Sequence, residues 1–206
     1  MKNFDLEKEN GRSMIEMLGV LAIIGVLSVG GIAGYSKAMQ KYRINKAIEQ
    51  ITLIAGNVRS FFAPQRSYND LTRCDQFSLN GQSCKIILKA KILPDEMITF
   101  GTKENHSEAL LTGITNPFGY GIGLERAVKS VTNDNKAFSI YYNMGDDENI
   151  CIELLTQDWK DAKVISLSDG TYPTIFLKTP VAVDTAVEKC SAINEATANS
   201  SKARGW

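Results

Sequence analysis

The stretch of sequence that decides the fold runs from Gly11 to Ser36 and reads GRSMIEMLGVLAIIGVLSVGGIAGYS. Its last 20 residues, Met17 to Ser36, carry no charge, and residues 1–11, which end at its first residue, are polar. A helix of this length spans about 30 Å, the hydrocarbon thickness of a bilayer. A secretory signal peptide would have a shorter apolar region followed by a small-residue cleavage site. The sequence therefore predicts a helix that crosses a membrane.

The helical pattern continues beyond Ser36, but there it becomes amphipathic. No proline interrupts it before Pro64, where the helix is expected to end. Polar side chains fall on other faces, at Lys46, Glu49, Gln50, Asn57 and Arg59. The apolar stripe consists of Ile44, Ile48, Ile51, Ala55, Val58 and Phe62. We expect one helix of about 50 residues whose second half needs a cover for this stripe.

The rest of the chain, residues 64–206, is expected to form a globular head of short strands. Turn residues occur at Asn80-Gly81 and at Asn116 to Gly121, and Pro94 stops the apolar stretch Ile86 to Leu93. The strand-like runs are Ala137 to Asn143, Ile150 to Leu155, Lys163 to Leu167 and Thr174 to Lys178. An antiparallel sheet with one apolar face would cover the helix stripe. The predicted fold class is therefore α+β.

Composition and charge exclude several classes of function. Lys and Arg total 23 and Asp and Glu total 23, so the chain has no excess of basic residues. We therefore do not expect nucleic acid as its main partner. His106 is the only histidine, and one residue cannot fill a zinc ligand set. The acidic run Asp146-Asp147-Glu148 is expected to be a solvated turn rather than a calcium loop. No nucleophile, base and orienting group form a set, so we expect no enzyme activity, no metal and no cofactor.

The four cysteines are Cys74, Cys84, Cys151 and Cys190, and none lies in a CxxC pair. An even number of cysteines in a chain with an export-like segment favours disulfides and an oxidising compartment. Four cysteines allow three pairings.

The N-terminal motif carries a resemblance to a known family. Gly11 ends a polar leader, Glu16 follows five residues later, and an uninterrupted apolar helix comes next. This arrangement resembles the class III signal of type IV prepilins. The resemblance implies that a prepilin peptidase cuts between Gly11 and Arg12 and that the new amine on Arg12 is methylated. It also implies that Glu16 is an assembly residue. The sequence departs from the family in having Arg12 where a hydrophobic residue is usual.

The head resembles that of type IVb pilins. Asn116 to Gly119 is similar to the turn that precedes their sheet, Phe138 to Tyr142 to a strand, and Cys151 to Leu154 to the segment with their first late cysteine. Cys190 would be the second cysteine of that pair. The resemblance thus implies a Cys151–Cys190 disulfide, and it leaves Cys74 to pair with Cys84 in a local segment of its own.

The resemblance implies a structural subunit of a type IV pilus, used for adhesion, aggregation or a related pilus function. Its parts would be a cleaved leader (1–11), a transmembrane and assembly half of the helix (12–36), an amphipathic half (37–63) and a head with two disulfides (64–206). The expected partners are other pilin subunits, the prepilin peptidase and an assembly platform. The subunit would cross the bacterial inner membrane once before it joins an extracellular fibre.

Three alternatives share part of this evidence. A minor pilin has the same leader and helix. A pseudopilin of a type II secretion system also shares them, but it usually has a smaller head without the late cysteine pair. A membrane-anchored periplasmic enzyme or binding protein would keep its leader uncut and would need a ligand pocket.

Overall fold

The protein is described by a computed structural model that covers residues 12–75, 82–102, 109–127, 136–145, 147–160, 164–167, 175–178 and 180–192. The chain divides into two compact units, Met1–Tyr42 and Arg43–Trp206. The leader residues, the Asn80-Gly81 turn and His106 lie outside the described residues.

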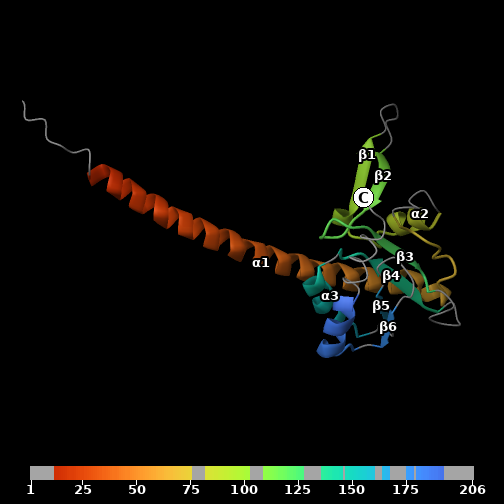
Figure 1. Ribbon diagram of the computed structural model, residues 1–206. Helices are drawn as coiled ribbons and strands as arrows, with labels where there is room; N and C mark the ends of the chain where they lie inside the picture. The colour runs from red at the N-terminus through yellow and green to blue at the C-terminus, as the bar shows by residue number, and fades with distance from the viewer. Residues whose placement is uncertain are drawn as a thin grey trace, which may run out of the picture. The chain divides into compact units, whose positions relative to one another are not determined.

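The predicted long helix is present as α1 (Arg12–Phe62), a continuous helix of 51 residues (Figure 1). It is long and apolar enough to cross a membrane, judged from length and composition. A short 3₁₀ helix, η1 (Ala63–Gln65), follows it. Pro64 stands in the first turn of η1, where its missing N–H costs no helical hydrogen bond. The prediction that the helix ends at this proline is correct to within two residues.

The buried stripe of the second half of α1 differs from the one expected. Ile48, Ile51 and Ala55 are only half-buried, and Gln50, expected on a polar face, is 5% exposed. The fully buried side chains are Ile44, Ala47, Ile54, Val58 and Phe62. The head covers the face of α1 that carries these residues, and it supplies hydrogen-bond partners for Gln50. Spacing alone could not reveal those partners.

The strands pair antiparallel, as expected, but they form three separate two-stranded sheets among the described residues. The pairs are β1 (Ile98–Thr102) with β2 (Ala109–Ile114), β3 (Ile122–Arg126) with β4 (Phe138–Tyr142), and β5 (Val164–Leu167) with β6 (Ile175–Lys178). The expectation of a single sheet is therefore wrong. One reason is visible at β3, whose second edge is taken by a loop segment. Cys74 and Leu124 exchange two backbone hydrogen bonds of 2.8 Å there.

The expected strand at Ile150 to Leu155 is a helix, α3 (Glu148–Leu155). Asp147 caps it, because its carboxylate accepts hydrogen bonds from the backbone N–H groups of Asn149 and Ile150 at 2.9 and 3.2 Å. Of the expected solvated turn, Asp147 is a helix cap and Glu148 the first residue of α3, while Asp146 lies outside the described residues. The buried side chains of α3 are Ile150, Cys151, Leu154 and Leu155, which lie on one helical face. Short apolar runs do not distinguish a strand from a buried helix.

A second short helix, α2 (Gln82–Lys89), includes the first part of the apolar stretch that Pro94 ends. It packs with the C-terminal end of α1 and with β3 in the main core. That core contains Ile54, Val58, Phe62, Leu71, Cys74, Cys84, Ile87, Met97 and Leu124, among others.

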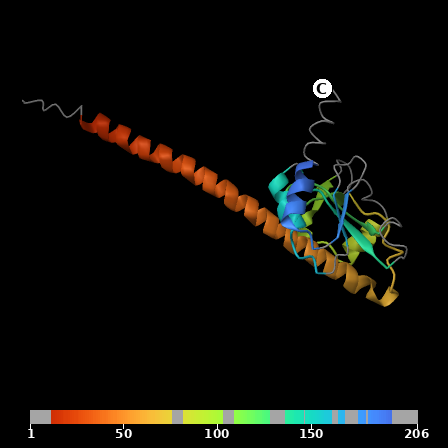
Figure 2. The ribbon, with the colours of Figure 1, turned by 60° about the horizontal axis from the view of Figure 1, so that its bottom comes forward.

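Two smaller clusters surround α3. One of them contains Ile44 and Ala47 of α1 with Ile150 and Leu154 of α3. The other contains Cys151 and Leu155 with Val181, Ala186 and Cys190. The last three belong to or adjoin the helical residues 183–192, drawn in blue beside the teal α3 in Figures 1 and 2. The C-terminal part of the head is therefore attached through α3 to the second half of α1.

Candidate assembly site

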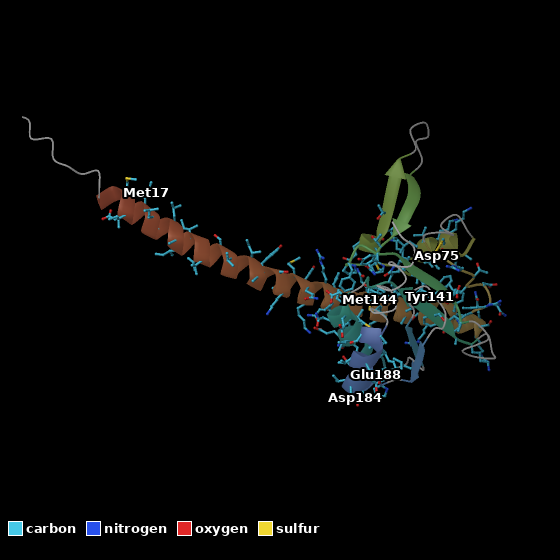
Figure 3. The ribbon with its side chains drawn as sticks, in the orientation of Figure 1. Met17, Asp75, Tyr141, Met144, Asp184 and Glu188 are labelled. Carbon is cyan, nitrogen blue, oxygen red and sulfur yellow. A yellow bond between two sulfur atoms is a disulfide. The ribbon has the colours of Figure 1, made fainter. Side chains whose placement is uncertain are left out.

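The first half of α1 presents an apolar surface that its own unit does not cover. Every described side chain from Met14 to Lys37 is exposed, including Val26 at 75%. Figure 3 shows these side chains, with Met17 labelled, extending outward from the helix. An apolar surface of this extent marks contact with a membrane or another protein chain. The segment predicted to cross a membrane is thus also able to pack against other helices.

Glu16 lies in the second turn of this helix, and it is exposed among apolar neighbours. Arg12 is the first residue of α1, directly after the predicted cut. Cleavage after Gly11 would therefore place a new amine at the helix start, about 6 Å along the axis from Glu16 at 1.5 Å per residue. Gly11 lies outside the described residues, so cleavage after it remains a prediction.

The four cysteines form two disulfides, Cys74–Cys84 and Cys151–Cys190, the pairing that the sequence analysis expects. The first joins the segment beside β3 to α2, and the second joins α3 to the helical residues 183–192. All four cysteines are buried. Each bond therefore links a short helix to another segment of the head.

The Asn116 turn is organised by its own side chain. Asn116 is 6% exposed, and its Oδ1 accepts hydrogen bonds from the N–H groups of Phe118 and Tyr120 at 3.0 and 3.1 Å. Its Nδ2 donates to the carbonyl of Asn143, just beyond β4. Gly119 has a φ of 86°, which favours glycine. The turn signal in the sequence was correct, and the structure adds that Asn116 ties the turn to the end of β4.

A polar network that was not predicted from the sequence connects α1 to the head. The amide of Gln50 donates to Glu96 at 2.9 Å and accepts from the hydroxyl of Tyr142 at 3.3 Å. Lys46 forms ion pairs with Glu96 at 3.0 Å and with Glu49 at 3.3 Å. The position of Gln50 could have indicated this network, because Gln50 lies three residues after Ala47 and four before Ile54, on the buried stripe of α1.

Three pKa values in this network depart from their ordinary values. Hydrogen bonds from Gln50 and then from Lys46 lower the pKa of Glu96 below its ordinary value. The hydrogen bond to Glu96 raises the pKa of Lys46. Burial raises the pKa of Tyr142, so its hydroxyl stays protonated and donates at neutral pH. The network is therefore fully formed near neutrality.

The described residues contain no cluster of three or more His, Cys, Asp or Glu side chains able to hold a metal ion. The described residues form a helix with an exposed apolar first half and a head with two disulfides. A long apolar helix followed by an α+β head with small antiparallel sheets defines a pilin-like fold.

Comparison with known proteins gives two distant relatives. Each is described as the major structural subunit of bundle-forming pilus, one from Escherichia coli O127:H6 (strain E2348/69 / EPEC) and one from Escherichia coli O111:H-. Each is 26% identical over 149 residues, which cover 72% of this chain and 64% of the relative. The match thus spans less than two thirds of the relatives' own length. No family model and no solved structure matches.

Proposed function

We propose that this chain is a structural subunit of a type IVb-like pilus that polymerises through α1. The observation that carries the proposal is the continuous helix whose first half is apolar and exposed while its second half is packed in the head. Such a helix is stable in lipid as a monomer and in a bundle of like helices as a polymer. The similarity to two major structural subunits of bundle-forming pilus supports a structural role, and their description favours the main subunit over a minor one.

The proposal includes the steps before assembly. A prepilin peptidase removes residues 1–11 at the cytoplasmic face and leaves an amine, open to methylation, on Arg12. The subunit then waits in the bacterial inner membrane, spanning it once, until an assembly platform adds it to the extracellular fibre. The uncharged run from Met17 to Ser36 supports this order, because it follows the proposed cut and would stay on the processed chain.

Glu16 has a specific role in this proposal. An ionised group near the bilayer centre costs about 2.5–3.5 kcal/mol on insertion scales, and it usually marks function. In the monomer Glu16 can stay near the headgroups, because it lies at the start of the apolar segment. In a bundle of apolar helices an unpaired carboxylate would be much more costly. The amine on Arg12 of a neighbouring subunit removes that cost when the two helices are staggered by about 6 Å, or four residues.

The experiment that tests the proposal is analysis of fibres sheared from the cell surface. We expect a dominant protein band whose N-terminal sequence begins at Arg12 and whose intact mass matches the chain without residues 1–11. A surface form that retains Met1 contradicts the processing step. Absence of this chain from sheared fibres contradicts the pilus function, and its presence only in trace amounts identifies a minor subunit.

A further inference from the structure

A hollow of about 310 Å³ lies on the surface of the second unit, between the second half of α1 and the segment that leads into β1. The exposed face of α1 contributes Glu49 and Leu53, which is 42% exposed. Asp95 and Glu96 of η2 (Asp95–Met97) form the other side. The role inferred for this hollow rests on the pilus function proposed above.

The charges in the hollow are unbalanced. Glu49, Asp95 and Glu96 bring three carboxylates, whereas Lys46 brings a single ammonium. Lys46 is already engaged with Glu49 and Glu96. Asp95 is exposed, and its carboxylate forms no hydrogen bond or ion pair with a described residue. With an apolar side chain at the rim, this chemistry fits a guanidinium whose carbon stem lies over Leu53.

The same chain offers such a group. Arg43 lies on α1 six residues before Glu49; it is exposed and in no ion pair with a described residue. We propose that the hollow receives Arg43 of a second copy of the chain, whose α1 runs parallel and is displaced toward the C-terminal end. The guanidinium then bridges Asp95 and Glu49 of the first copy.

The displacement follows from helix geometry. To bring Arg43 of one copy level with Glu49 of the other, the second helix must shift by six residues, or about 9 Å. The pairing of the Arg12 amine with Glu16 requires a shift of four residues in the same direction, or about 6 Å. A flexible arginine side chain absorbs a difference of this size, so one stagger satisfies both pairings. Lys37 would need a shift of 12 residues, about 18 Å, and is therefore out of register.

The test uses the full-length chain in cells that assemble it, with the yield of sheared fibre as the measurement. We expect Arg43→Asp and Asp95→Arg each to lower this yield about tenfold or more, because each places like charges together. The chain with both substitutions restores opposite charges between copies, and its yield should return to within about twofold of the unsubstituted chain. Lys85→Asp is the matched control, since Lys85 is exposed on α2 and does not line the hollow. Its yield should not change.

Processing and membrane level of each variant are measured in parallel. If Arg43→Asp does not accumulate, Arg43→Gln and Asp95→Asn provide the test, since both remove attraction without adding repulsion. Unchanged fibre yield in accumulating variants overturns the Arg43 pairing, and so does failure of the double substitution to restore it. If the unsubstituted chain forms no fibre, the proposed function itself is wrong.

Discussion

Ile51→Ala and Ile54→Ala are a matched pair of substitutions that tests which face of α1 is buried in the head. Both remove the same three carbons from the same helix, so the change in helix propensity cancels between them. Ile54 is 0% exposed in the main core, whereas Ile51 is half-buried. The stripe predicted from spacing contains Ile51 and omits Ile54, so the two descriptions of the helix give opposite expectations.

The magnitude follows from the burial of each side chain. At about 0.8 kcal/mol per carbon, loss of three buried carbons costs about 2.4 kcal/mol at residue 54. The enclosed cavity adds about 1–2 kcal/mol, for a total of about 3.5–4.5 kcal/mol. At residue 51 a somewhat smaller transfer cost applies and no closed cavity forms, so the expected loss is about 1.5–2 kcal/mol. The difference between the two variants is therefore about 1.5–3 kcal/mol.

Urea unfolding of the detergent-solubilised chain measures this difference. Trp159 is a suitable fluorescent probe, because it packs beside α1 in the cluster of Ile44 and Ala47 and its indole N–H donates to the carbonyl of Leu154 at 2.8 Å. The midpoint for Ile54→Ala should fall well below that for Ile51→Ala, with the slope of the transition unchanged. Equal losses, or a larger loss at Ile51, would refute the burial described here.

Three further outcomes are expected. Replacing both Cys151 and Cys190 with Ala should lower the free energy of unfolding by up to about 4 kcal/mol, since the disulfide joins residues 39 apart in the sequence. Urea unfolding of this variant and of the unsubstituted chain measures the loss. Non-reducing peptide mapping of the unsubstituted chain must show the Cys151–Cys190 link. Glu16→Val should leave membrane insertion and cleavage normal while fibres fail to form; wild-type fibre yield with confirmed processing would remove Glu16 from the assembly mechanism. Because hydrogen bonds lower the pKa of Glu96 in the folded state, its contribution to stability is present above the ordinary pKa of about 4.3 and is lost as pH falls through the folded value. Glu96→Gln should therefore reduce the loss of stability between about pH 5 and pH 3, and an unchanged pH profile would contradict the shift.

Local features of the sequence predicted the elements whose causes are local. An uncharged run of 20 residues followed by a pattern of three- and four-residue spacings can form only a long helix, and α1 is that helix. Pro64 ends it because proline cannot donate a helical hydrogen bond. Asn116 and Gly119 form a turn because an amide side chain can bond the backbone two and four residues on, and because glycine tolerates a positive φ. In each case the cause lies within a few residues of its effect.

The candidate processing residues, Gly11 and Arg12, and the candidate assembly residue, Glu16, can be proposed from the sequence for the same reason. They form a linear motif that is recognised by the order and spacing of residues along the chain. The hollow beside α1 could not be predicted in this way. Glu49 and Asp95 are 46 residues apart, and only the path of the chain through α2 brings them to one surface.

The sequence by itself determined that the chain has one long helix with an apolar first half, a turn at Asn116 and a head of short strands. Only the tertiary structure decided that residues 148–155 form a helix, that the strands in the described part of the chain pair as three hairpins, and that Gln50 rather than Ile51 faces the head. The physical reason is that a short apolar run is equally stable as a strand or a helix until neighbours cover one of its faces. A buried amide is likewise tolerable only where Glu96 and Tyr142, distant in sequence, satisfy its hydrogen bonds.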